Sequence, residues 1–411
     1  MKQMLTVPPI QFAAKASSRT AVQWGRKIFP TVAILPAIVV RLLVFSWFGQ
    51  PAVALAQTNG ERPVALYPLP PISIHHLQTL TDATGIHEFA HGTIPWHENG
   101  YCAEDVGRAL AAVTLYEQVT GKTDGRPLTR IYLAYLRKSL RTDGEIWNRK
   151  DRAFASGDSY GRILWGLGVA ASFQTDQTNR ESAARLFERI LPGWERKLGD
   201  YPIARACAMQ GLAAFLKSHL NPEARAALLR CAELNLQAFR RQSDQEWKWF
   251  DETMTYDGGR LPLSLLVAFQ TTGDSRFRDA GLASLDFLAA TCFDAKGAQL
   301  SLVGNKGWFK KGGVPARFDQ QPIDAASMIE VCVLAARLTG KPEYSQRART
   351  AFEWFLGNNA KQAALYDAQS GGCRDGLTEN GANQNEGGES TIMYLIARCN
   401  LESLLNDSQH Q

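Results

Sequence analysis

Carboxylates recur in this sequence just before apolar stretches that have the period of helices. Three copies of one pattern separate an acidic residue from an arginine by two or three residues, with glycine directly before the arginine: Glu104-Asp105-Val106-Gly107-Arg108, Asp158-Ser159-Tyr160-Gly161-Arg162 and Asp257-Gly258-Gly259-Arg260. A fourth stretch, Phe318-Asp319-Gln320-Gln321-Pro322-Ile323-Asp324, lacks the arginine. If these helices pack side by side, their acidic starts form a ring of carboxylates around a common mouth. Paired carboxyl groups are typical of general acid and base catalysis.

The same carboxylates also have a structural interpretation. Aspartate is favoured at the N-terminus of a helix because its side chain accepts hydrogen bonds from free backbone N–H groups. A single copy of the pattern would therefore indicate no more than a helix cap. Three copies leave the structural and the functional interpretation about equally supported.

One segment matches the pattern of zinc peptidases. In the H-E-x-x-H pattern two histidines on one helix face bind zinc and the glutamate acts as base. The match here is His87-Glu88-Phe89-Ala90-His91, but Gly85 and Gly92 on either side leave room for barely two helical turns. A zinc hydrolase is therefore the less favoured alternative, and we expect neither a metal nor an organic cofactor.

Aromatic and amide side chains cluster in the long connections between the expected helices. Sugars stack their apolar C–H faces on aromatic rings, while amides and carboxylates bind their hydroxyl groups, so this mixture suits a carbohydrate cleft. The arginines of the repeated pattern would keep neighbouring carboxylates ionised. The residues expected to bind substrate are Tyr101, Arg108, Arg162, Arg260, Trp308, Gln320, Gln321 and Asn385.

The first 56 residues differ in charge from the rest of the chain. They contain six basic side chains and no acidic one, so the remainder has 39 basic against 40 acidic side chains and its formal charge falls from +5 to −1. The basic pI therefore comes from this leader. The composition of the chain beyond residue 56 does not indicate binding to nucleic acid or to an anionic membrane surface.

The leader, residues 1–56, also has the features of a signal peptide. A basic region precedes an apolar stretch over 29–48, and Ala54-Leu55-Ala56 matches the small-residue pattern of a signal-peptidase site. We expect cleavage after Ala56 and export to the periplasm or the cell exterior. An uncleaved inner-membrane anchor is the alternative, although Arg41 would cost about 2.5–3.5 kcal/mol at the centre of a bilayer. Residues 57–80 are proline-rich and are expected to form an extended lead-in.

Beyond residue 80 the apolar residues recur with a helical period. Eleven helices are expected, near 104–119, 126–140, 158–174, 180–197, 202–218, 222–241, 260–271, 275–291, 323–338, 343–356 and 387–405, and a short one near 82–91 would make twelve. Helix pairs that recur every roughly 50 residues indicate stacked hairpins. The long connections on one side favour a closed ring over an open solenoid. We therefore predict an all-α protein, an (α/α)6 toroid over 81–405 with a tail at 406–411.

Seven cysteines lie in the body without short paired spacings, and an odd number cannot pair completely. Most of them fall in helical patterns and are expected to be small core residues. A bridge between Cys102 and Cys373, which lie beside glycine-rich motifs, is left open.

Several motifs resemble those of a bacterial family of six-hairpin proteins. They are Gly85-Ile86, Gly100-Tyr101-Cys102, Asp158-Ser159, Thr255-Tyr256-Asp257, Gly304-Asn305-Lys306-Gly307-Trp308, Phe318-Asp319-Gln320-Gln321-Pro322 and Asn385-Glu386-Gly387-Gly388-Glu389-Ser390-Thr391. Members of that family resemble (α/α)6 glycosidases, and some are fused to glycosyltransferase domains. The resemblance covers 80–405 and implies the toroid and an activity on carbohydrate. It also implies likeness to sugar 2-epimerases, but these use histidines on late hairpins, where this chain has none.

Two positions depart from the pattern of that family. Where the family has Asp-Asp-Asn-Ala-Arg, this chain has Glu104-Asp105-Val106-Gly107-Arg108 and lacks an amide at the mouth. The histidines of the H-E-x-x-H match fall where the family has aliphatic or small residues. This second departure supports the interpretation of that match as chance.

We predict an exported glycoside hydrolase that acts on an oligo- or polysaccharide through two carboxyl groups. The predicted acid/base pair is Asp105 and Asp257, and the further candidates are Asp158, Asp319 and Glu389. The alternative is a non-catalytic glycan-binding protein, or a partner of a glycosyltransferase in polysaccharide assembly. The missing amide beside Asp105 keeps that alternative open.

Overall fold

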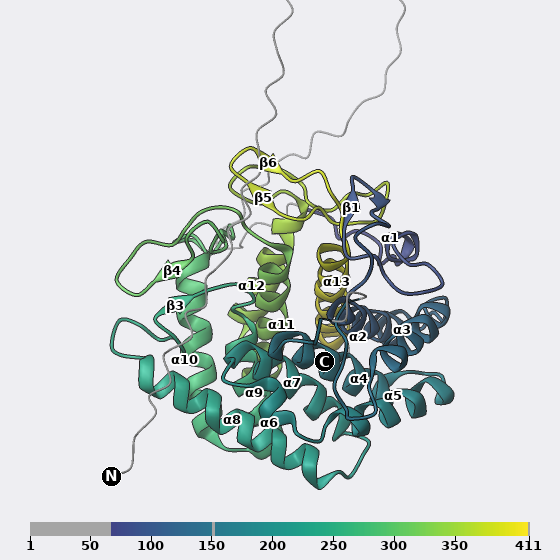
Figure 1. Cartoon of the computed structure of the whole chain (residues 1–411). Coiled ribbons are helices and arrows are strands. Elements are labelled where there is room, and N and C mark those ends of the chain that lie inside the picture. Colours follow the sequence, from purple (N-terminus) through teal and green to yellow (C-terminus); the bar gives the residue numbers. More distant parts are fainter. Residues whose placement is uncertain (1–66, 150–152, 410–411) are drawn as a thin grey trace, which may run out of the picture. The chain divides into compact units, whose positions relative to one another are not determined.

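The computed structural model describes residues 67–149 and 153–409, and the leader with most of the lead-in lies outside the described residues. Within the unit Val64–Gln411, six helices form a closed inner ring (Figure 1). They are α2 (Ala103–Thr120), α4 (Gly157–Phe173), α7 (Pro202–Phe215), α9 (Arg260–Thr272), α11 (Pro322–Thr339) and α13 (Gly388–Gln409). Each contacts the next, and α13 contacts both α11 and α2, which closes the ring.

A second set of helices packs on the outside of this ring. In chain order they are α1 (His75–Thr79), α3 (Arg126–Ser139), α5 (Gln177–Ile190), α8 (Pro222–Gln242), α10 (Ser275–Cys292) and α12 (Pro342–Glu353). All of them except α1 form a hairpin with the preceding inner helix, and the short α1 packs against α13 at the other end of the chain. A further short helix α6 (Trp194–Leu198) and a 3-10 turn (Trp354–Leu356) complete the described helices. The predicted all-α toroid is confirmed.

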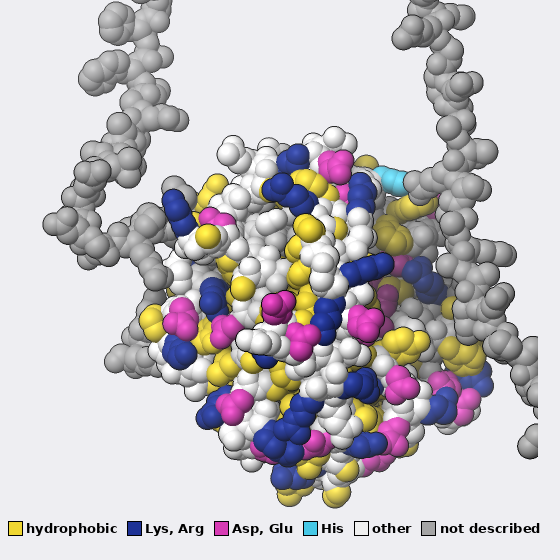
Figure 2. Space-filling model, turned by 90° about the vertical axis from the view of Figure 1, so that its left-hand side faces the viewer, with side chains coloured by type: hydrophobic (Ala, Val, Ile, Leu, Met, Phe, Trp, Pro, Cys, Tyr) yellow, Lys and Arg dark blue, Asp and Glu magenta, His cyan; other side chains and the backbone are white. Residues whose placement is uncertain are grey.

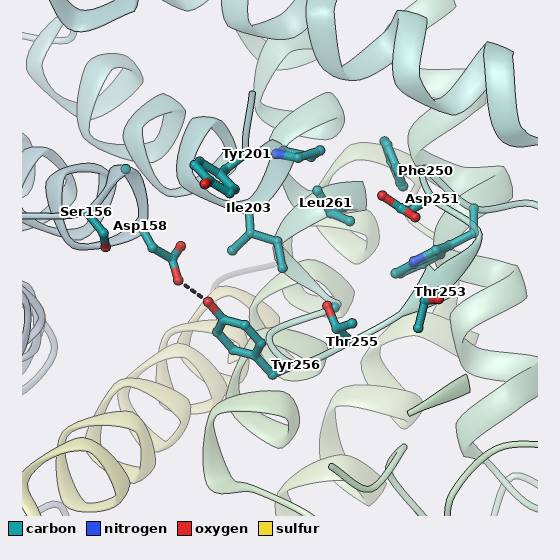
Figure 3. Close-up of a pocket in the computed structure, with 14 residues that line it drawn as sticks. Ser156, Asp158, Tyr201, Ile203, Phe250, Asp251, Thr253, Thr255, Tyr256 and Leu261 are labelled. Atoms are coloured by element: carbon teal, nitrogen blue, oxygen red, sulfur yellow. Dashed lines mark hydrogen bonds between the residues drawn. The ribbon is translucent and has the colours of Figure 1, made fainter. Parts of the chain in front are cut away.

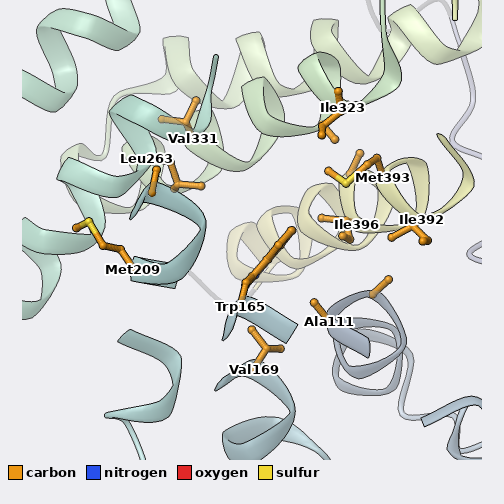
Figure 4. Close-up of a cluster of buried hydrophobic side chains, with 14 of the residues drawn as sticks. Ala111, Trp165, Val169, Met209, Leu263, Ile323, Val331, Ile392, Met393 and Ile396 are labelled. Atoms are coloured by element: carbon orange, nitrogen blue, oxygen red, sulfur yellow. The ribbon is translucent and has the colours of Figure 1, made fainter. Parts of the chain in front are cut away.

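The two rings differ in burial because the inner helices are covered on all sides. Every residue of α11 from Pro322 to Val333 is buried, whereas α5 buries one face, formed by Asn179, Ala183, Leu186, Phe187 and Ile190. Apolar side chains from different inner helices meet in the centre, among them Trp165, Met209, Leu263, Val331 and Ile396 (Figure 4). The middle of the ring is therefore a packed core.

Glycines let three inner helices approach closely. A Cβ atom on Gly166 of α4 would lie 2.0 Å from the carbonyl oxygen of Gly107 on α2. A Cβ atom on Gly168 of α4 would lie 2.1 Å from the carbonyl oxygen of Gly211 on α7. The helices α2, α4 and α7 thus touch through backbone, where no side chain fits between them.

Strands are few and short in the described residues. Three antiparallel pairs occur in connections: β1 (Ala90–His91) with β2 (Ile94–Pro95), β3 (Thr253–Met254) with β4 (Phe309–Lys310), and β5 (Leu377–Thr378) with β6 (Gly381–Ala382). The second and third pairs lie in the long connections between helices, whereas β1 and β2 lie in the segment before α2.

Three local predictions are wrong. The helix expected near 82–91 is absent, since this segment is irregular and then enters β1, while a helix forms at 75–79 within the lead-in that was expected to be extended. The helix expected over 180–197 is interrupted and ends at Ile190 before α6 begins. All seven cysteines are free and buried, so no bridge joins Cys102 to Cys373.

The outer surface carries charges of both signs. On the face shown in Figure 2, acidic and basic side chains are interspersed. Of the described helices, none is both long and apolar enough to cross a membrane.

Candidate active site

The first turns of the inner helices carry ionisable side chains that meet one another. Arg108 on α2 contacts Glu389 on α13 at 2.6 Å, and Arg162 on α4 lies 3.5 Å from Asp257, which precedes α9. The backbone N–H of Asp257 in turn donates to Asp324 on α11 over 2.6 Å. The predicted gathering of acidic helix starts at one end of the ring, called the mouth below, is confirmed.

Three buried arginines organise the mouth. Arg108 donates to Asp105 as well as to Glu389, and Arg162 donates to Asp158 over 2.8 Å. The third, Arg260, contacts Asp257 over 3.1 Å and binds both carboxylate oxygens of Glu330 on α11, at 2.6 and 2.9 Å. Two-point contacts of this kind fix both the position and the orientation of a carboxylate.

The predicted acid/base pair faces these arginines. The side chains of Asp105 and Asp257 are only 2% and 1% exposed. Burial raises the pKa of the Asp105 carboxyl, and the guanidinium of Arg108 opposes this effect. The catalytic role of the two residues stays a prediction, and the structure gives both of them a partner inside the protein.

Two other carboxylates are partly open to solvent, and Glu389, the partner of Arg108, is more exposed at 41%. The side chains of Glu104 on α2 and Asp158 on α4 are each 22% exposed. They lie 3.8 and 2.8 Å from the same nitrogen, Nη1 of Arg162. The hydroxyl of Ser159 donates to Glu104 over 2.7 Å, and the hydroxyl of Tyr256 donates to Asp158 (Figure 3). Adjacent helices thus present two carboxylates around one cation.

A cavity of about 580 Å³ opens beside Asp158. Its walls combine aromatic and small polar side chains from the starts of α4, α7 and α9 (Figure 3). Asp158 and Asp251 are the ionisable carboxylates among its described lining residues, and no basic side chain occurs there. The aromatic lining residues are Tyr201, Trp249, Phe250 and Tyr256.

The remaining predicted residues are spread around the mouth and its loops. Trp308 is half-buried with its ring centroid 6.2 Å from that of Tyr256, and Asp319 lies 3.4 Å from the ammonium group of Lys306. Gln321 is half-buried directly before α11. These positions border the same end of the ring as the carboxylates.

Three predicted substrate-binding residues are engaged in structural contacts. Gln320 is fully buried, and its side-chain oxygen accepts from the backbone N–H of Leu302 over 3.1 Å and from the indole of Trp354 over 2.9 Å. Asn385 accepts from the backbone N–H of Gly92 over 3.0 Å. The hydroxyl of Tyr101 donates to Asp82, as described below.

Sequence reasoning missed several groups at the mouth. Glu330 lies well inside α11, beyond any helix start, so no local pattern marked it. Asp324 was part of the fourth stretch, but its role was not recognised. Burial raises its pKa well above the ordinary value, with the nearby charge of Asp257 adding to the effect. One of its oxygens accepts from backbone, while the other, Oδ2, has no hydrogen-bond partner among the described residues.

Glu88 also reaches the mouth, although not in the way the zinc-peptidase pattern requires. Residues 87–91 are not helical, which removes the geometry that pattern needs. The Glu88 side chain is 10% exposed and pairs with Arg149. Burial, followed by the charge of Asp105, raises its pKa.

Solved structures with a similar fold are enzymes of sugar chemistry. A D-mannose isomerase superposes with a TM-score of 0.62 at 14% identity, covering 81% of this chain and 95% of its own. A sugar epimerase from a ruminal bacterium gives 0.63 at 11% identity, with 82% and 97% covered. An alpha-1,6-mannanase of glycoside hydrolase family 76 from a Salegentibacter species gives 0.53 at 13% identity, with 80% and 96% covered. The chain has the six-hairpin (α/α)6 fold of these enzymes.

Comparison with models of known protein families gave no match, and comparison with curated protein sequences gave none either. At identities between 11% and 14%, the structural likeness shows a common fold. The function must therefore be argued from the mouth itself.

Proposed function

We propose that the chain is a carbohydrate-active enzyme that hydrolyses a glycosidic bond at the mouth. The observation that carries this proposal is the pair Glu104 and Asp158, two open carboxylates on neighbouring helices that share one nitrogen of Arg162. Glycoside hydrolysis uses two carboxyl groups on either side of the scissile bond, one as general acid and the other as base or nucleophile.

The adjoining cavity supports a sugar as the substrate. Aromatic rings offer faces for the apolar side of a sugar ring, and the neighbouring threonines and carboxylates can bind its hydroxyl groups. With two carboxylates and no basic side chain in the described lining, the cavity favours neutral over anionic sugars. The names of the structural neighbours, which include isomerases, epimerases and mannanases, point to the same class of substrate.

The contacts of the two carboxyl groups indicate which of them is the base or nucleophile and which is the acid. Asp158 accepts from both Arg162 and Tyr256, donors that stabilise a carboxylate, so it acts as the ionised base or nucleophile. Glu104, which accepts from the hydroxyl of Ser159 and lies farther from Arg162, acts as the acid that protonates the leaving oxygen. In this assignment Asp105 fixes the position of Arg108, and Asp257 fixes that of Arg260.

The proposal is tested with a panel of neutral and uronate-containing oligosaccharides and mass-spectrometric product analysis. The variants Asp158→Asn and Glu104→Gln should lose turnover by about 10²- to 10⁴-fold, because each removes proton chemistry and keeps the shape. The matched control is Asp251→Asn, an exposed carboxylate in the same cavity that has no arginine contact in the described structure. Because Asp251 can bind a sugar hydroxyl but is not one of the two proposed catalytic groups, this variant should change KM and keep kcat.

Two outcomes would contradict the proposal. Full activity in both variants would show that Glu104 and Asp158 are helix-start residues without a catalytic role. Binding of a glycan without any turnover by the wild type would instead select the non-catalytic alternative, including a part in polysaccharide assembly.

A further inference from the structure

We propose that Asp82, His87 and His97 form a binding site for a divalent transition metal of the zinc type. The three residues lie in the segment that leads into α2, and each offers one ligand atom within 4.8 Å of the others. Two imidazoles and a carboxylate form a ligand set that suits Zn²⁺, Co²⁺ or Ni²⁺ better than Mg²⁺ or Ca²⁺, which prefer oxygen alone.

His87 is the first argument for a ligand at this place. The residue is 1% exposed. Among the described residues its Nδ1 has no hydrogen-bond partner, and its Nε2 lies 3.3 Å from a carboxylate oxygen of Asp82 without the geometry of a hydrogen bond. Buried polar atoms in proteins are nearly always satisfied, so an orphaned imidazole indicates a missing partner.

Asp82 lies at the distance from His87 that two ligands of one metal ion would have. Its Oδ2 atom lies 3.3 Å from Nε2 of His87. Zinc bonds of about 2.0–2.2 Å in tetrahedral geometry place two ligand atoms about 3.3–3.6 Å apart. The nitrogen and the oxygen therefore already have the spacing of two ligands on one ion.

The carboxylate of Asp82 is held by neighbours of its own. Its Oδ1 accepts from the backbone N–H groups of Thr84 and Gly85, at 2.7 and 3.3 Å, and Oδ2 accepts from the hydroxyl of Tyr101 at 2.5 Å. Hydrogen bonds of this kind orient the ligands in metal sites. They give Tyr101, which was expected to bind sugar, a positioning role.

His97 completes the set from the solvent side. Its ring centroid lies 4.4 Å from that of His87, and the residue is exposed. An ion can therefore enter past His97, and water can take the fourth position. A bound ion would crosslink the two ends of the segment 82–97. The same segment positions Glu88 at the mouth.

A second cluster in the described residues is a weaker candidate. Glu88, Cys102 and Asp105 also have ligand atoms within 4.8 Å of one another. However, Arg149 already pairs with Glu88, and Arg108 already pairs with Asp105. These guanidinium groups supply the positive charge that a metal would bring.

The site departs from the expectation that the chain holds no metal, and it also differs from the H-E-x-x-H pattern. In that pattern His91 would be the second ligand, but His91 is exposed on β1 with its ring centroid 4.5 Å from that of Trp96. His91 therefore provides a matched control in the same segment.

The test is calorimetric titration of the chelator-treated full chain with Zn²⁺, supported by the visible absorption of bound Co²⁺. We expect one ion per chain in the wild type and in His91→Ala, and loss of this binding in His87→Ala and His97→Ala. Tyr101→Phe should keep the stoichiometry and weaken binding about 10- to 100-fold, as the loss of an orienting hydrogen bond does elsewhere.

Absence of stoichiometric binding in the wild type would overturn the proposal, and so would equal loss in His91→Ala. If His87→Ala does not fold, His97→Ala decides the matter, because His97 lies on the surface. Unchanged affinity in the folded His97→Ala variant would then count against the site.

Discussion

Burial separates the carboxylates of the mouth into two chemically different kinds. Asp257 is enclosed with Arg260 and Glu330, so these charges compensate one another away from water. Glu104 and Asp158 also share a guanidinium, but their side chains remain partly open. A buried partner cannot be removed without leaving the other charge uncompensated, whereas an open carboxyl can exchange a proton with a substrate. The buried carboxylates therefore fix the positions of the arginines, and the partly open ones remain accessible to a substrate.

Asp324 shows how a buried carboxyl makes stability depend on pH. Its folded-state pKa lies well above the ordinary value of 3.8 because of burial, so the native state binds this proton more tightly than the unfolded chain. The stabilising contribution is then complete below the pKa of the unfolded chain, and it is lost as the pH rises through the raised pKa of the folded protein.

Asp324→Asn should remove this dependence, because asparagine resembles the neutral acid and can still accept the N–H of Asp257. Relative to the wild type, the variant should gain stability progressively as the pH rises from about 4 toward 7. Chemical denaturation of both proteins across that range provides the measurement. A difference in unfolding free energy that is independent of pH would contradict the raised pKa.

The sequence located the carboxylates of the mouth but not the direction in which each one points. Glu104 and Asp105 are consecutive, and neighbours on a helix are about 100° apart around its axis. One side chain therefore faces Arg162 on α4 while the other turns to Arg108. Only the relative rotation of packed helices decides which of the two is open, and no local pattern encodes that rotation.

At the scale of elements, the inner helices are held together where they lack side chains. Gly166 and Gly107 bring α4 against α2, and Gly168 and Gly211 bring α4 against α7. Since Glu104 and Asp158 begin α2 and α4, this close approach also brings the two open carboxylates near the same arginine. The packing of the helices and the geometry of the proposed site are thus coupled.

Gly166→Ala tests this coupling. The added Cβ would lie 2.0 Å from a backbone oxygen, which cannot move aside as a side-chain end can, so the two helices must separate. Overpacking of this kind typically costs about 1–3 kcal/mol. Thermal and chemical denaturation measure the loss, and Gly125→Ala, whose Cβ would be 3.6 Å from its nearest contact, serves as control. Equal stability of the two variants would show that α2 and α4 can separate at Gly166 at little cost in free energy.

Ten of the eleven expected helices were predictable because their signals are local. Apolar periodicity marked their extent, and Gly121, Gly273 and Gly340 end helices in the left-handed conformation that glycine adopts readily. The segment before α2 was not predictable in this way. It is fixed by distant contacts, such as the hydrogen bond between His76 and the backbone of Glu386 and that from the N–H of Gly388 to Glu88.

At the scale of the whole molecule, the ring closes by joining the two ends of the described unit. The helix α1 lies near its beginning and packs against α13 at its end. A closed ring removes the exposed terminal faces that an open solenoid must cap. The helices α1 and α13, which form the sixth pair, are far apart in the sequence. This separation explains why the five hairpins of consecutive helices were easier to predict than this pair.

The leader remains a proposal at this same scale. We propose that residues 1–56 direct export and are then removed, since they hold six basic side chains and no acidic one, with an apolar stretch that ends at Ala54-Leu55-Ala56. In a bacterial host with a general export pathway, intact-mass analysis of the mature chain should place its first residue at Gln57. Ala56→Leu should block cleavage because the small residue at this position is lost, while Ala52→Leu, outside the A-x-A pattern, should be processed normally. A native chain that retains residues 29–48 would establish a membrane anchor instead, and the body would then work at the membrane surface.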